Sequence, residues 1–179
     1  MEEGKYIQLG FNAEDIANYM AREIENNLLH LQYSDYVLTY YKVYTDNFWD
    51  HKWQLSALFP SMGLSRRYHH VYDDKDIPYD AWSNIHFGVI GTYVGYSKEK
   101  LLNGAGYAQK ISNQHFIGTK MIYAGIGYYT NYANGAKYDN DIDSYLISNG
   151  IELYLTKNIN ISSQDLLNSV SNIYKGLKK

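Results

Sequence analysis

The sequence predicts a mainly α (α+β) fold, a single globular helical domain with a small β-hairpin element. Apolar residues recur at helical spacing over residues 13–31, and Ser97 and Ser162 each open a stretch with the composition of a helix start. Residues 66–79 read instead as two short strands about an acidic turn. A chain of 179 residues suits one domain, and no repeat or linker divides it, so we expect residues 1–179 to fold as a unit.

The N-terminal part is predicted to hold two helices and a loop. Asn12 is a good helix N-cap, and the carboxylates that follow it favour a helix over residues 13–31. A second helix is expected over Tyr36–Tyr44. The stretch Phe48–Trp53 is rich in aromatic residues and encloses an acid, an imidazole and an amine, and we expect it to be a loop.

The predicted hairpin leads directly into the next helix. Its two adjacent histidines, His69 and His70, would point to opposite faces of a strand, so they form a poor chelating pair. Asp80 is a candidate N-cap for the helix that follows. Glycines in that helix would let a neighbouring element approach closely. These are Gly88, Gly91 and Gly95.

The C-terminal half is predicted to hold three helices and one irregular region. Ser97 caps the first helix and Ser162 the last, each followed within three residues by a charged or amide side chain. Apolar residues between Tyr145 and Leu155 predict the helix between them. Residues 112–137 alternate glycine with tyrosine, which is typical of a hairpin or flap.

Composition argues against several kinds of protein. A net charge of −3 provides no overall basic field for a nucleic-acid backbone, which makes a nuclease less favoured without excluding it. With no cysteine, the chain has no disulfide, zinc–thiolate site or cysteine nucleophile. No apolar run reaches the roughly 18–20 residues of a membrane span, and Met1–Gly4 does not begin a signal peptide. If the domain works outside the cell, we expect another segment to carry it there.

Three carboxylates at alternate positions form the strongest local candidate for a site. Asp139, Asp141 and Asp143 repel one another unless a cation or a basic group joins them. On a loop they can converge on a hard cation, Ca²⁺ ahead of Mg²⁺, through oxygen ligands. The alternative is a solvated acidic start of a helix, which requires no ligand.

Other polar residues could complete an acidic pocket. Asp80 and Asp50 would add carboxylates, and Lys52, Arg66 or Arg67 could hold an anionic substrate. His86 could be a general acid or base, since its unperturbed pKa lies near neutrality. The alternative for His86 is a core histidine bonded to a backbone carbonyl. No motif of a serine hydrolase, a nucleotide-binding loop or a zinc protease occurs.

Several separate blocks of the chain, in order, resemble the polymorphic toxin type 44 family (bacterial toxin 44). Members of that family are toxin modules of secreted proteins used between competing bacteria, and an immunity protein usually neutralises them. The resemblance implies one toxin-type catalytic domain, exported by a carrier. The blocks are Trp49-Asp50-His51-Lys52, Tyr79-Asp80-x-Trp82-x-Asn84-Ile85-His86-Phe87-Gly88 and Leu101-Leu102-Asn103-Gly104-Ala105-Gly106-x-Ala108-Gln109.

The acid-rich pattern is also similar to a Ca²⁺-dependent toxin that cleaves the phosphate ester of lipid II, a lipid-linked cell-wall precursor. This similarity implies a hydrolase that acts in the target cell envelope. By this similarity Asp80, Asp139 and Asp143 would be the metal and catalytic acids. We predict His86 as a further catalytic residue and Asp141 as a further cation ligand. The predicted substrate-binding residues are Trp49, Lys52, Arg67 and Asn84.

Two alternatives stay open from the residues alone. One is a metal-independent ribonuclease toxin that uses His86, Asp50 and Lys52, and in this case nucleic acid would be the partner. The other is a non-enzymatic binding domain in which the polar clusters are satisfied core groups.

Overall fold

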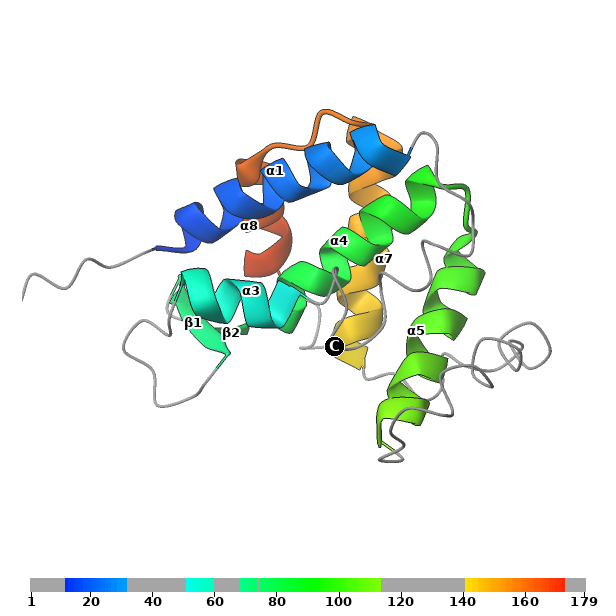
Figure 1. Ribbon diagram of the computed structural model, residues 1–179, viewed down its shortest axis with the longest axis horizontal. Coiled ribbons are helices and arrows are strands. Elements are labelled where there is room, and N and C mark those ends of the chain that lie inside the picture. Colours follow the sequence, from blue (N-terminus) through cyan, green and yellow to red (C-terminus); the bar gives the residue numbers. More distant parts are fainter. Residues whose placement is uncertain (1–11, 32–50, 60–67, 74, 114–140, 173–179) are drawn as a thin grey trace, which may run out of the picture.

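A computed structural model describes residues 12–31, 51–59, 68–73, 75–113 and 141–172 (Figure 1). Within these residues it confirms a mainly helical fold with one small antiparallel hairpin. The elements are α1 (Ala13–Leu31), α3 (His51–Leu58), β1 (His69–Tyr72), β2 (Lys75–Pro78), α4 (Asp80–Tyr93), α5 (Lys98–Asn113), α7 (Asp141–Lys157) and α8 (Ser163–Ser171). None of these helices is long and apolar enough to cross a membrane.

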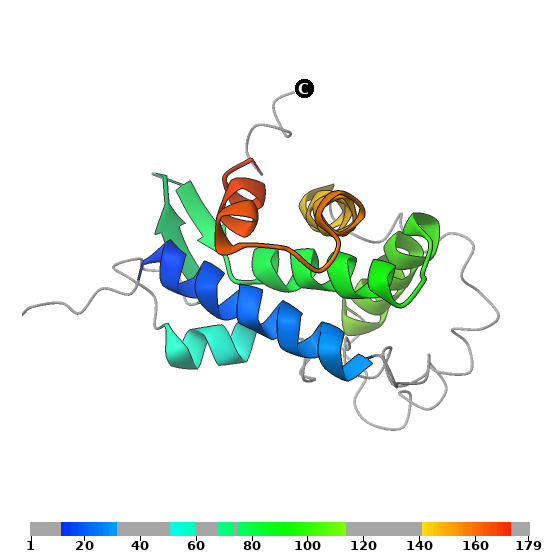
Figure 2. The same cartoon turned by 90° about the horizontal axis from the view of Figure 1, so that it is seen from above.

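Helix α4 is the centre of the fold. Both α3 and α7 pack on α4. Figure 1 shows α7 running across α4, and Figure 2 shows α7 end-on beside α4. The crossing is close because Gly88 of α4 lies against the backbone of Ile147, and Gly150 of α7 lies against the backbone of Ile85. The predicted role of Gly88 is therefore confirmed. Helices α1 and α8 complete the core with α4.

Most buried apolar side chains form one cluster, and Ile147 belongs to a second, smaller cluster with Tyr96, Leu101 and Ile151. The largest fully buried side chains are Trp82, Tyr79, Ile16, Met20, Ile24, Leu55, Ile77, Ile85, Ile90, Leu146, Ile147 and Leu166. They come from α1, α3, α4, α7, α8 and the hairpin with its following turn, so segments distant in sequence share one buried surface. Burial of this kind is the main favourable term in folding.

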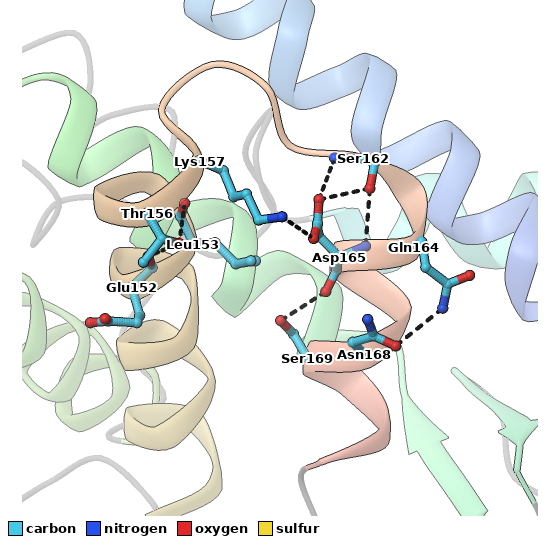
Figure 3. A network of polar contacts seen from close by, with 9 residues as sticks. All are labelled: Glu152, Leu153, Thr156, Lys157, Ser162, Gln164, Asp165, Asn168 and Ser169. Atoms are coloured by element: carbon cyan, nitrogen blue, oxygen red, sulfur yellow. Dashed lines mark hydrogen bonds and ion pairs between the residues drawn. The ribbon is translucent and has the colours of Figure 1, made fainter.

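Capping sets the start of the last helix, as predicted (Figure 3). The Ser162 hydroxyl accepts a hydrogen bond from the Asp165 backbone N–H at 3.2 Å, and the Asp165 carboxylate accepts one from the Ser162 backbone N–H at 3.0 Å. This reciprocal pair is a capping box. Lys157, at the end of α7, lies 3.0 Å from Asp165 and joins the two helices.

Three sequence predictions need correction. Asp80 is the first residue of α4 and not its N-cap, a position that Tyr79 occupies without a side-chain cap. His51–Trp53 belong to α3, although an aromatic loop was predicted there. A distant residue stabilises the start of α3, because the hydroxyl of Ser83 in α4 accepts a hydrogen bond from the first backbone N–H of α3. Helix α5 continues to Asn113, where a flap was expected to have begun.

The rest of that flap and the predicted helix Tyr36–Tyr44 lie outside the described residues. The hairpin itself is confirmed. Strands β1 and β2 pair so that His70 faces Ile77, and both side chains are buried. As the alternation of a strand requires, His69 points the other way and lies 3.1 Å from the Asp76 carboxylate.

His70 joins the hairpin to α4 inside the core. Its side chain is fully buried, and its Nε2 accepts a hydrogen bond of 2.9 Å from the Trp82 indole Nε1–H. Its ring stacks on those of Tyr79 and Trp82. Burial lowers the pKa of His70 to about 4, since a charged imidazole would lose its water there.

This low pKa predicts a loss of stability in acid. In the unfolded chain His70 takes up a proton near pH 6.5, but in the folded chain only near pH 4. The neutral, buried ring therefore contributes its full stabilisation of the fold above pH 6.5, and this stabilisation is lost as the pH falls to 4. Between pH 7 and pH 4.5 the loss from this residue is about 2.5 kcal/mol. Urea unfolding of wild type and His70→Gln at both pH values measures it. On going from pH 7 to pH 4.5, His70→Gln should lose about 2.5 kcal/mol less of its free energy of unfolding than the wild type loses. Equal losses in the two proteins would contradict the lowered pKa assigned to His70.

Candidate functional site

Three helices contribute polar side chains to one strip of the surface. Lys52 of α3 places its Nζ 2.8 Å from Asp80 Oδ1 of α4. One turn further along α4, Asn84 donates a hydrogen bond of 2.7 Å from Nδ2 to Asp143 Oδ1 of α7. Asp80 and Asn84 are four residues apart and therefore share a face of α4. We call Lys52, Asp80, Asn84 and Asp143 the polar strip.

Both ends of α3 are fixed on α4, which places Lys52. At the start of α3, the His51 backbone N–H donates a 3.1 Å hydrogen bond to Ser83 Oγ. At its end, the Tyr79 hydroxyl donates to the carbonyl oxygen of Phe59. A helix tied in this way has little freedom to rotate, so Lys52 lies over the first turn of α4.

The close crossing of α4 and α7 places Asp143. Because Gly88 and Gly150 carry no side chain, the two helix backbones come into contact one to two turns beyond Asn84 and Asp143. This contact fixes the register of α7 along α4, and so the carboxylate of Asp143 meets the amide of Asn84. The strip is a consequence of the helix packing.

The strip is open to water. The side chains of Lys52 and Asp80 are 31% and 45% exposed, so their ion pair is worth at most about 1 kcal/mol and can open for a ligand. Asp141, the first residue of α7, is exposed and two residues from Asp143. Carboxylates in the first turn of a helix also favour the helix itself, so the position of Asp141 alone does not indicate a site.

Of the predicted cation ligands, Asp80, Asp141 and Asp143 lie in the described part of the chain. Carboxylate oxygens are the ligands that Ca²⁺ and Mg²⁺ prefer, so the donor type fits a hard cation. No group of three or more potential ligands is assembled among the residues that the structure describes. Asp139, Trp49 and Arg67 lie outside those residues, and their predicted roles remain predictions.

His86 lies behind the strip and is completely buried. Its Nε2 is 3.1 Å from the amide Nδ2 of Asn27, and its ring meets that of His51 edge to face at 4.6 Å between centroids. Burial, and then the neighbouring His51, lower the pKa of His86 well below its ordinary value, which keeps the ring neutral. A ring enclosed in this way supports the strip and does not reach its surface.

Sequence reasoning did not assign Asn27, His51 or Ser83 to the site. His51 is part of the first motif block already noted, and this was the available signal, whereas Ser83 occupies an unspecified position of the second block. Asn27 is a polar residue on a helix that was predicted from its apolar positions. No local pattern distinguishes it from its neighbour Asn26, so only the packing of α1 on α4 identifies it.

Fold and site together define a mainly helical domain with an acidic, solvent-open strip where three helices meet. The chain belongs to the bacterial toxin 44 family, whose model matches residues 39–156. The matched region includes all four residues of the polar strip and both buried histidines beside it. No curated protein and no solved structure matches the chain. It is therefore a bacterial toxin domain, as its sequence motifs predicted.

Proposed function

We propose that this toxin domain is an antibacterial effector that hydrolyses a phosphate ester in a lipid-linked cell-wall precursor such as lipid II. The supporting observation is the polar strip, in which two carboxylates, an amide and an ammonium group from three separate segments share an open surface. Phosphate esters carry negative charge. A site for them needs cationic groups that hold the phosphate and acidic groups that bind a metal or move protons.

Each residue of the strip has a role in this proposal. The Lys52 ammonium exchanges its contact with Asp80 for the phosphate oxygens of the substrate. The Asn84 amide donates to one oxygen of Asp143 and so orients this carboxylate, which would bind the cation or accept a proton. Arg67 and Trp49 are proposed as further contacts to the substrate.

A calcium ion is the proposed cofactor, held by Asp80, Asp141 and Asp143 together with Asp139. When bound, it would supply charge that polarises the phosphoryl group. His86 was predicted to be a general acid or base. Its burial favours a supporting role, in which the neutral ring keeps α4 in place against α1 and α3.

Partners and delivery follow from the family. A cognate immunity protein is the expected protein partner, and a carrier or secretion system would bring the domain to the envelope of the target cell. We propose that the lipid-linked precursor is met there, outside the cytoplasm.

Comparing compartments tests this proposal. The domain is expressed in a bacterium with and without an N-terminal export signal, and viable cells are counted. Killing is expected only with the signal, because the proposal places the encounter with the precursor outside the cytoplasm. Asp143→Asn protein with the same signal is the control for export stress. Killing without export, together with RNA decay that persists in EDTA, would contradict the proposal and favour a metal-independent ribonuclease.

A further inference from the structure

We propose that the half-buried Asn27 and the buried His86 and His51 form a positioning network. Its role is to fix the place where Lys52 meets Asp80, and this part rests on the function proposed above. The three residues come from α1, α4 and α3, so the network crosses the centre of the fold and ends beside the polar strip.

The network begins with a directional hydrogen bond between α1 and α4. The Asn27 Nδ2 atom lies 3.1 Å from His86 Nε2. An amide nitrogen can only donate, so Nε2 of His86 is the acceptor and the ring proton lies on Nδ1. This arrangement requires a neutral imidazole, in agreement with the lowered pKa of His86.

The network continues from α4 to the first residue of α3. The rings of His86 and His51 lie 84° apart in an edge-to-face contact. His51 is itself fully buried, and its Nδ1–H donates to Gln54 Oε1 at 2.9 Å. Together with the hydrogen bond from its backbone to Ser83, these contacts fix both the backbone and the ring of His51.

Lys52 follows His51 directly, so its backbone position is set by the network. The ion pair between Lys52 and Asp80 is too weak to hold the backbone of Lys52 in place, because both side chains are substantially exposed. Two apolar residues in place of the histidines could pack α3 against α4. They would not reproduce the edge-to-face contact between the two rings, nor the hydrogen bonds that orient each ring through Asn27 and Gln54. Positioning therefore explains why polar side chains are buried here at a cost in desolvation.

The test uses Asn27→Asp in the full chain. This change is nearly isosteric, but a carboxylate cannot donate to Nε2. Long-range ¹H–¹⁵N spectra should show the Nδ1–H tautomer of His86 in the wild type and protonation of Nε2 in the variant. Amides of α3 should exchange with solvent on the order of tenfold faster in the variant, while those of α8 keep the wild-type rate. Asn18→Asp, an exposed position on the same helix, is the matched control.

A double-variant cycle links the network to Lys52. If the network acts through this residue, Asn27→Asp should lower toxicity in the wild-type background and cause no further loss in Lys52→Ala. An Nε2–H tautomer in the wild type would overturn the proposal without any variant, and so would unchanged exchange of α3 in Asn27→Asp. Faster exchange with full toxicity would leave the hydrogen bonds assigned but overturn the positioning of Lys52 by the network. The proposed function would still stand in that case if Lys52→Ala protein lost toxicity.

Discussion

Replacing Gly88 by alanine is expected to destabilise the domain by about 3 kcal/mol, although alanine favours a helix over glycine by about 1 kcal/mol. The added Cβ would overlap the carbonyl oxygen of Ile147 and lie 2.9 Å from the backbone nitrogen of Ile151. Both neighbours are backbone atoms of α7, so relief requires the two helices to separate. Urea unfolding of the purified protein measures the loss.

Gly91→Ala is the matched control, because it lies on the same helix and makes the same chemical change. There the new methyl group would meet only the end of the Leu101 side chain, which can change its rotamer. We expect its stability to stay within about 1 kcal/mol of the wild type. Equal losses for the two variants would show that the close crossing of α4 and α7 does not hold the fold together.

Asp80→Asn is expected to reduce killing by the exported domain on the order of 100-fold, the scale of removing one group that stabilises charge in a reaction. The substitution removes a proposed cation ligand and the partner of Lys52 without changing the size of the side chain. Stability should change by less than about 1 kcal/mol, because the lost ion pair is exposed. Counts of surviving cells and a thermal unfolding curve measure the two effects separately.

Asp73→Asn provides a matched comparison. Asp73 is also an exposed carboxylate paired with a lysine, Lys75, at 2.6 Å, but it lies in the hairpin away from the polar strip. We expect this variant to kill as well as the wild type. If Asp73→Asn and Asp80→Asn were equally harmless, the polar strip would not be the site of toxicity.

The sequence predicted the elements whose signals are local. The helix over residues 13–31 has a cap and a regular apolar stripe, and Ser162 with Asp165 forms a capping box that can be recognised without a structure. The hairpin could be predicted from its acidic turn and the strand residues on either side of the turn. In each of these cases the residues that stabilise the element lie within or beside it.

Features that depend on distant partners could not be predicted in the same way. The start of α3 is stabilised by Ser83, 32 residues further along the chain, so the local composition indicated a loop. Asn84 and Asp143 are 59 residues apart, and so are Asn27 and His86. Both residues of the first pair were chosen from motifs, but their hydrogen bond follows only from the crossing of α4 and α7. The burial of His86 has the same origin.

The central claim is that the polar strip carries out hydrolysis of a phosphate ester. In the most direct test of this claim, the purified domain is incubated with vesicles that contain a lipid-linked cell-wall precursor, and the products are separated by chromatography. We predict a new phosphorylated head group that appears with Ca²⁺, disappears with a chelator and is not formed by Asp143→Asn protein. Intact precursor with the folded wild-type domain and Ca²⁺, or equal cleavage by wild type and Asp143→Asn, would contradict the claim.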